Sequence, residues 1–145
     1  MSVLRLDNIG VFVSDLDAAI AYFEELGLTN LGRQLVEGEF AEACTGLTDQ
    51  LCEIAMMSTP DGHSRLELCY FHRPAAVRNG AEGPVNTLGI RKLMFAVTDI
   101  HDTVERLKAH GAELFGTVAN YEDTYLLCYL TGPDGIIVAL AEQIG

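Results

Sequence analysis

The feature that most constrains this chain is an internal repeat. Residues 8–20 align with residues 92–104 at a constant offset of 84 residues, and the alignment continues until Gly27 falls on Gly111. A chain with two copies of one supersecondary unit is expected to build two similar modules that share a core. At 145 residues the two modules together fit a single domain.

A second correspondence joins the later parts of the two copies. The turn at residues 59–62 and the run 66–68 match the turn at 132–135 and the run 138–140, so that Glu67 falls on Ala139. The offset is shorter here, which leaves about a dozen extra residues in the first copy, supplied by residues 40–50. We therefore expect the two copies to differ by one insertion.

Local sequence patterns predict the same element order in each copy. In the first copy they predict a strand at 4–13, with Ser14 as the helix N-cap and Asp17 completing a capping box. Helical apolar spacing then leads to a C-cap at Gly27. Further strands are predicted at 30–39, 51–58 and 64–71, and in the second copy at 88–97, 112–119, 124–130 and 136–141 around a helix that ends at Gly111.

The order βαβββ, repeated, predicts an α+β fold in which two modules form a curved eight-stranded mixed sheet around a cleft. We expect one domain over residues 1–145. Its first module covers residues 4–72, its linker 73–87 and its second module 88–143.

Composition excludes several classes of function. Nine Lys and Arg against 21 Asp and Glu give a net charge of −12, which repels phosphate backbones and anionic lipid, so we expect neither a nucleic-acid nor a membrane partner. The first residues have no signal-peptide layout. The four cysteines are scattered among apolar neighbours. That pattern favours reduced thiols and a cytoplasmic location.

These features resemble the vicinal oxygen chelate superfamily. The residues that carry the resemblance are Val-Ser-Asp-Leu at 13–16, Val-Thr-Asp-Ile at 97–100, and a Pro-Asp-Gly turn before the last strand of each unit. The superfamily includes glyoxalase I, methylmalonyl-CoA epimerase, extradiol dioxygenases, and fosfomycin- and bleomycin-resistance proteins. The resemblance covers about residues 4–143 and implies a glyoxalase-like fold and a homodimer. The resemblance does not identify the reaction, because members of the superfamily catalyse many different reactions.

In metal-dependent members of that superfamily, a divalent ion is held by the first and fourth strands of each unit. The resemblance places those positions at Asn8, Glu67, Lys92 and Ala139. Ala139 has no donor atom, and Lys92 is an ammonium with no acceptor. We therefore expect no metal and no other cofactor. A displaced metal site that uses His63 and Glu67 is the alternative.

Lys92 is a candidate to replace the missing ion. We expect Glu67 and Lys92 to be the catalytic pair, joined by an ion pair or a shared hydrogen-bond network with Asn8 alongside. The alternative is that Lys92 only reaches out to solvent. Further side chains are expected to contact the ligand: Phe12, Met56, Met94 and Tyr121. For Met56 the alternative is core packing, and for Tyr121 it is a solvated hairpin loop.

The sequence thus predicts a protein that binds a small, partly apolar molecule in a cleft between the modules, with a degraded metal site. It either binds without chemistry or transfers a proton with Glu67 as the base, in which case it is a lyase or isomerase. The first alternative is a metal-dependent lyase, isomerase or dioxygenase. The second is a non-catalytic interaction module.

Overall fold

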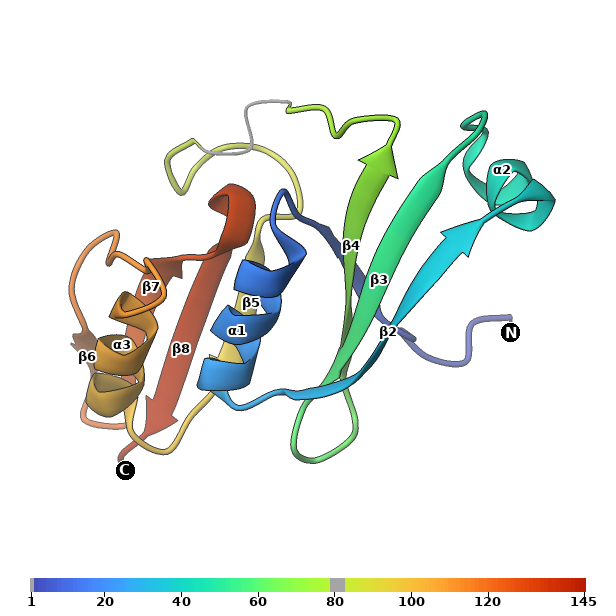
Figure 1. The fold of residues 1–145 in the computed structure, drawn as a ribbon. Coiled ribbons are helices and arrows are strands. Elements are labelled where there is room, and N and C mark those ends of the chain that lie inside the picture. Colours follow the sequence, from blue (N-terminus) through green and yellow to red (C-terminus); the bar gives the residue numbers. More distant parts are fainter. Residues whose placement is uncertain (1, 79–82) are drawn as a thin grey trace. The chain divides into compact units, whose positions relative to one another are not determined.

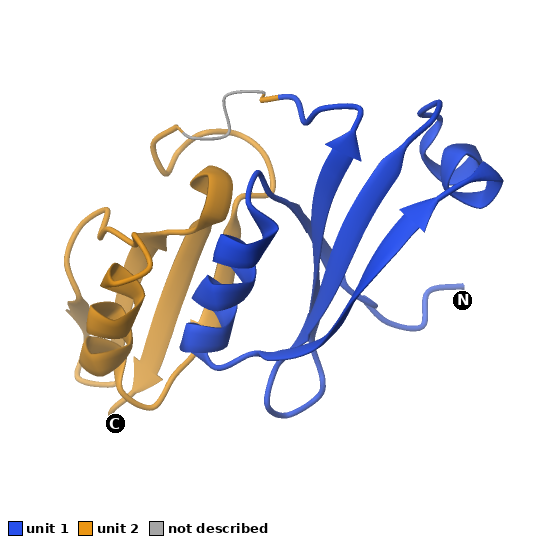
Figure 2. Cartoon of the chain, in the orientation of Figure 1, with its two compact units in different colours: residues 1–77 blue, residues 78–145 orange. Residues whose placement is uncertain are grey.

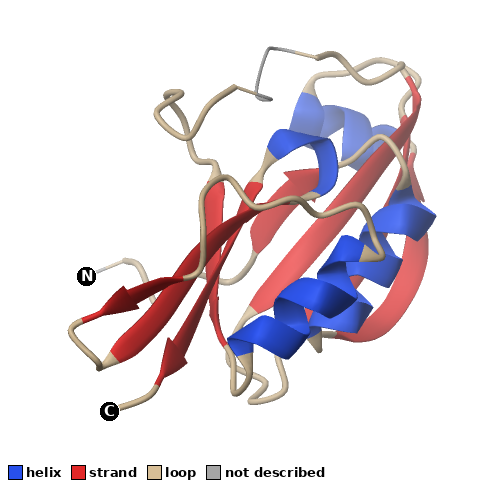
Figure 3. Cartoon of the chain, turned by 90° about the vertical axis from the view of Figure 1, so that its left-hand side faces the viewer, coloured by secondary structure: helices blue, strands red, loops and turns tan. Residues whose placement is uncertain are grey.

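The computed structural model describes residues 2–78 and 83–145. The chain divides into two compact units, residues 1–77 and 78–145, which Figure 2 colours separately. Figure 3 distinguishes the helices from the strands in both units.

The first unit is a four-stranded mixed sheet with two helices. Its elements are β1 (Ile9–Phe12), α1 (Leu16–Leu26), β2 (Thr29–Glu37), α2 (Glu39–Thr45), β3 (Leu51–Ser58) and β4 (Arg65–Arg73) (Figure 1). The strand order is β1-β4-β3-β2, in which β1 runs parallel to β4 and the other pairs are antiparallel. Helix α2 lies within the predicted insertion.

The second unit repeats this plan without the insertion. Its elements are β5 (Lys92–Ala96), α3 (Ile100–Lys108), β6 (Ala119–Tyr121), β7 (Tyr125–Thr131), the 3-10 turn Pro133–Gly135 and β8 (Ile137–Gln143). The strand order is β5-β8-β7-β6, again with one parallel pair, β5 and β8. The predicted α+β fold with two βαβββ modules is confirmed, and its eight strands are divided between two four-stranded sheets.

Strand register confirms the alignment of the two copies. Gly10 lies opposite Glu67 in the β1–β4 pair, and Met94 lies opposite Ala139 in the β5–β8 pair. Gly10 and Met94 are separated by the 84 residues of the repeat. Glu67 and Ala139 therefore occupy equivalent places in the two sheets, as the sequence alignment predicted.

Helix α1 begins one residue later than the sequence predicted. Asp15, rather than Ser14, caps α1: its backbone is extended, and its carboxylate accepts a hydrogen bond of 3.0 Å from the Ala18 amide. Asp99 caps α3 in the same way, at 3.0 Å from the Asp102 amide. The predicted C-cap at Gly27 is confirmed, with a φ of 121° that favours glycine.

Three predicted strands are shorter than expected. The strands predicted at 4–13 and 88–97 are only β1 and β5, and most of 112–119 forms no strand apart from one bridge between Leu114 and Leu130. Apolar side chains before β1 are instead exposed, with Leu4 at 90%. A strand extends only where a neighbouring strand pairs with it. The first residue of β1, Ile9, pairs with Leu66, and β4 begins only one residue earlier, at Arg65. The chain before Ile9 therefore has almost no strand beside it to pair with.

The core of each unit lies between its long helix and one face of its sheet. In α1 the buried side chains follow a helical stripe: Leu16, Ala19, Ile20, Tyr22 and Phe23. In α3 the stripe is Ile100, Thr103, Val104 and Leu107. No helix in the described part of the chain is long and apolar enough to cross a membrane.

The equivalent caps give a test of the repeat. We expect Asp15→Ala and Asp99→Ala each to lower the free energy of unfolding by about 1 kcal/mol, because each leaves a helix-terminal amide without its partner. Asp→Asn at the same positions should cost less, since the amide oxygen can still accept. Urea denaturation of the four variants measures this. Alanine variants as stable as the asparagine variants would contradict the assignment of the caps.

Candidate functional site

The first sheet has one face covered by α1 and one face opposite α1. Helix α1 contacts β2, β3 and β4, and the side chains of Ala55, Met57, Leu66 and Leu68 on its side are buried. Because side chains alternate along a strand, the residues between them point away from α1. The face opposite α1 therefore carries a mixed set of side chains: Phe12, Cys52, Ile54, Met56, Glu67, Cys69 and Phe71.

Glu67 is half-buried at the middle of the face opposite α1. Met56 lies directly across from it in the β3–β4 register. The thiol of Cys69 donates a hydrogen bond to Glu67 Oε1 at 3.3 Å. Burial raises the pKa of the Cys69 thiol, with a further contribution from the neighbouring Glu67 carboxylate, so this thiol keeps the proton that it donates. The Glu67 carboxylate is thus held by a neutral donor beside an adaptable apolar side chain.

An aromatic pair adjoins this carboxylate. Phe12 on β1 stacks on Phe71 of β4, with ring centroids 6.0 Å apart and an interplanar angle of 9°. Phe12 remains 64% exposed, which is unusual for a phenylalanine on a sheet face. Asn8 is half-buried directly before β1. The first unit therefore places Glu67, Met56 and Phe12 on one face of its sheet.

In the second unit, Lys92 begins β5. Its ammonium donates a hydrogen bond of 3.0 Å to the Tyr129 hydroxyl and lies 5.1 Å from the centroid of that ring. Tyr129 itself lies opposite Ala139 in the β7–β8 register. Lys92 and Tyr129 line a hollow of about 340 Å³, within the range of about 300–1,000 Å³ typical of small-molecule sites.

The other two predicted contact residues differ in position. Met94 follows Lys92 on β5 by two residues, so it shares the face of Lys92, and it is 49% exposed. Tyr121 lies on β6, at the opposite edge of the same sheet from β5. It pairs with Tyr125 at the hairpin and is 57% exposed. The register places Met94 and Tyr121 on the same face of this sheet, but only Met94 lies at the edge that carries Lys92.

Glu67 and Lys92 belong to different units, so their joint network stays a prediction. Each residue has a partner that the sequence analysis missed: Cys69 for Glu67 and Tyr129 for Lys92. The Cys69 thiol was noted only as a buried cysteine, and two-residue spacing on a strand could have indicated its contact. Tyr129 is 37 residues from Lys92, and only the sheet register brings the two together.

The donor chemistry at the family's metal positions does not fit a divalent ion. Ala139 is fully buried and has no donor, and the Lys92 ammonium already donates to Tyr129. His63, the alternative ligand, lies exposed in the turn before β4, where its amide binds Asp61 Oδ1 at 3.0 Å. Among the described residues, no group of three or more His, Cys, Asp or Glu side chains is placed to hold a metal.

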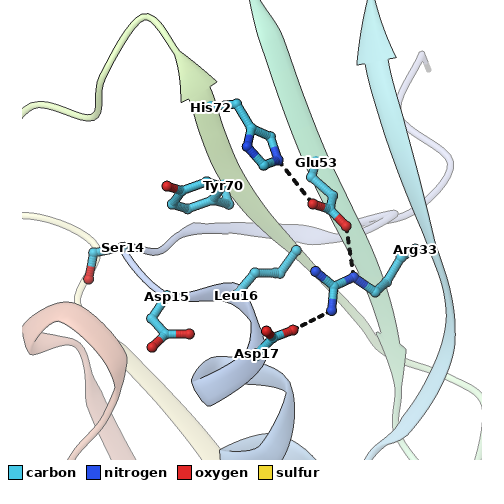
Figure 4. A pocket seen from close by; sticks show the side chains of 8 residues that line it. All are labelled: Ser14, Asp15, Leu16, Asp17, Arg33, Glu53, Tyr70 and His72. Carbon is cyan, nitrogen blue, oxygen red and sulfur yellow. Dashed lines mark hydrogen bonds and ion pairs between the residues drawn. The ribbon is translucent and has the colours of Figure 1, made fainter.

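A second polar site in the first unit was not predicted. It is a hollow of about 300 Å³ at the N-terminus of α1, on the α1 side of the sheet (Figure 4). Arg33 Nε donates to Glu53 Oε2 at 2.8 Å, and its Nη1 donates to Asp17. His72 Nε2 lies 3.0 Å from Glu53 Oε1. The network joins α1 to β2, β3 and β4, and no sequence spacing signals it.

Charge pairing in this network shifts two pKa values. The Arg33 hydrogen bond is the largest cause that lowers the pKa of Glu53, followed by the His72 hydrogen bond. The hydrogen bonds to Asp17 and Glu53 raise the pKa of Arg33. Hydrogen bonds and ion pairs here connect side chains of β2, β3 and β4 with one of α1. The network is therefore suited to holding helix α1 against the sheet.

Comparison with known proteins identifies the family of this chain from its sequence. The sequence model of the Glyoxalase/Bleomycin resistance protein/Dioxygenase superfamily matches residues 5–140. A glyoxalase family protein from Bacillus cereus has a solved structure with 51% sequence identity and a TM-score of 0.94, covering 100% of this chain and 97% of that one. No match is found among curated proteins.

More distant solved structures share the fold. A glyoxalase family protein from Enterococcus faecalis has 19% identity and a TM-score of 0.62, covering 98% of this chain and 100% of that one. An antibiotic binding protein from Streptomyces has 19% identity and a TM-score of 0.61, covering 99% and 98%. At these identities the likeness concerns the fold alone.

Thiol reactivity tests the burial of the three cysteines that lie on sheet strands, Cys52, Cys69 and Cys128. We expect only one of the four free cysteines, the exposed Cys44, to react with Ellman's reagent in the folded protein at about pH 8. Burial raises the pKa of Cys52, Cys69 and Cys128, so their reactive thiolate forms are suppressed. All four should react after denaturation. A second thiol that reacts as fast as Cys44 would contradict this packing.

Acid titration tests the Glu53 network. Glu53 has a lower pKa in the folded protein than the value of about 4.3 in an unfolded chain, so it stabilises the fold above that pH. This contribution is lost as the pH falls through the folded pKa. Thermal unfolding between about pH 6 and pH 3 should show a smaller loss of stability in Glu53→Gln than in the wild type. Parallel curves for the two proteins would contradict it.

Proposed function

This chain belongs to the Glyoxalase/Bleomycin resistance protein/Dioxygenase superfamily, and from that premise we propose that it binds a small, partly apolar molecule without a resident divalent metal. In metal-dependent relatives the ion supplies positive charge to substrate oxygens. Here the Lys92 ammonium supplies it. The residues at the family's metal positions support this assignment, because only Glu67 among them is a usual ligand type.

The observation that carries the proposal is the Lys92–Tyr129 contact. A 3.0 Å hydrogen bond and a cation–π contact hold the ammonium at the edge of a hollow. A lysine fixed in this way presents its remaining donors in a defined direction and costs less to order when a ligand arrives. It acts as a point charge, which can stabilise a developing oxyanion.

The face opposite α1 offers a second candidate surface, which lies within the first unit. Phe12 keeps most of its ring exposed although it stacks on Phe71, and Met56 can adapt its shape beside Glu67. A carboxylate between an aromatic pair and a flexible thioether can accept a hydrogen bond from a bound molecule or remove a proton from it. The protein therefore acts as a binder or as a metal-free proton-transfer enzyme, a lyase or isomerase.

The Streptomyces antibiotic binding protein supports binding as a function for this fold. Cytoplasmic location, homodimerisation and the joint use of Glu67 and Lys92 by one ligand stay predictions from the sequence.

A thermal-shift screen with a library of small aromatic and aliphatic metabolites tests the proposal. A ligand present at about 100 times its Kd stabilises the fold by about 2.7 kcal/mol, which raises Tm measurably. We expect the shift produced by such a ligand to be lost in Glu67→Gln and in Lys92→Ala. Glu105→Gln and Lys108→Ala are the matched controls, because these residues form an exposed ion pair on α3, 3.0 Å apart.

Metal analysis separates the proposal from a metal-dependent enzyme. Protein purified without a histidine tag should contain no stoichiometric divalent ion. A near-stoichiometric ion that disappears in Glu67→Gln would overturn the proposal. A library in which no compound shifts the wild type, at concentrations that saturate ordinary small-molecule sites, would instead favour an interaction module.

A further inference from the structure

The Lys92 hollow contains a second positive charge with unusual surroundings. Arg91 is only 8% exposed, although arginine is almost never buried without a partner. Its Nη1 donates to the Pro84 carbonyl at 2.6 Å, and its Nη2 donates to the carbonyls of Gly83 and Gly135 at 2.9 and 3.1 Å. All three partners are neutral, so the guanidinium charge is solvated by backbone dipoles alone.

Among the residues that the structure describes, the buried Nε of Arg91 has no hydrogen-bond partner. Neither Arg91 nor Lys92 forms an ion pair or hydrogen bond with a carboxylate of the described residues in its own unit. This is notable in a chain with 21 acidic residues and nine basic ones, where Arg78, Arg106 and Lys108 of the same unit each pair with a carboxylate.

Lys92 is exposed, but Arg91 is buried, and a buried cation that meets no carboxylate among the described residues of its unit is costly. The electrostatic free-energy cost of these positive charges falls when an anion binds in the hollow. Opposite charges attract each other more strongly there than in bulk water. Arg91 also fixes the loop at residues 83–90 through its bonds to Gly83 and Pro84. The wall of the hollow is therefore held in place before any ligand arrives, which lowers the entropy cost of binding.

Three of the five other residues that line the hollow are aliphatic, and the remaining two are Thr87 and Gly89. Val85 and Ile90 contribute side chains that are 42% and 93% exposed, and Ile137 forms a buried part of the lining. Exposed aliphatic side chains next to two cations suit an organic anion better than an inorganic one. The apolar body of such a ligand would cover Val85 and Ile90, while its charged group would meet Lys92.

We propose that this hollow binds a small organic anion, an apolar body that carries a carboxylate or phosphate group, through the Lys92 ammonium and the Tyr129 hydroxyl, with Arg91 supplying further positive potential. The inference rests on the proposed function and gives its ligand a chemical class. Lys92 donates a charge-assisted hydrogen bond to the anionic oxygen, and the Tyr129 hydroxyl, which accepts from Lys92, is free to donate its own proton.

Amide chemical-shift titrations with sodium benzoate, phenyl phosphate and benzyl alcohol test this class. The three probes share an aromatic body, and only benzyl alcohol is neutral. In buffer without phosphate, benzoate or phenyl phosphate should shift the amide signals of residues 85–92 and of Tyr129. Loss of a hydrogen bond to a charged group predicts that Lys92→Met weakens binding of the effective anion about tenfold or more. Lys108→Met, the control, should bind as the wild type does.

A second measurement keeps the test valid if Lys92→Met does not fold. The chain has two lysines, Lys92 and Lys108, so reductive methylation with 13C-formaldehyde labels two side chains besides the N-terminus. The effective anion should move the Lys92 signal and leave the Lys108 signal in place. Binding by benzoate alone or by phenyl phosphate alone also supports the proposal and decides which anionic group is preferred.

The outcomes distinguish this inference from the proposed function. Equal affinity for benzoate and benzyl alcohol, with no dependence on Lys92, would overturn the anionic class and leave binding of apolar molecules intact. Anions that leave the signals of residues 85–92 unmoved at saturation would overturn the hollow as their site. The proposed function fails separately, when no compound of the metabolite screen gives a shift that depends on Glu67 and Lys92.

Discussion

Parallel pairing between the first and the last strand of each unit is the constraint on which the rest of the structure depends. A parallel pair needs a crossover connection, and here the helix and two strands provide it. The pairing also sets the register, which places Gly10 opposite Glu67 and Met94 opposite Ala139. Because side chains alternate along a strand, this register decides which residues join the helix-covered core and which remain for chemistry.

The two copies differ at the positions that the sequence analysis singled out as candidate site residues. Glu67 in the first unit is replaced by a buried alanine in the second, whereas the first strand of the second unit begins with a lysine. A duplicated unit allows this, since each copy can keep its core while its other face changes. The result is a negative charge held by a thiol in one unit and a positive charge held by a phenol in the other.

A lysine ammonium and a divalent metal ion stabilise negative charge on a substrate in different ways. An ion can chelate two neighbouring oxygens in fixed geometry, whereas an ammonium offers three donors and one charge. Under the proposed function, an ammonium in place of an ion favours recognition of a single anionic oxygen, or stabilisation of a single oxyanion, over chelation of a vicinal pair. The neutral partners of Arg91 point in the same direction, because they leave its positive charge available to a ligand.

Much of the fold could be predicted from the sequence, because the repeat, the helical stripes and Gly27 are local signals that do not depend on which strands are neighbours. Those signals predicted the βαβββ order and the equivalence of Glu67 and Ala139. They missed the ends of the strands, since a strand stops where its partner stops. They also missed Tyr129 and the Arg33–Glu53–His72 network, whose members are far apart in sequence. Composition and local spacing determined the order of elements in each unit and the C-cap at Gly27. Only the tertiary structure decided which side chains meet, because hydrogen bonds between strands depend on a register that no local pattern specifies.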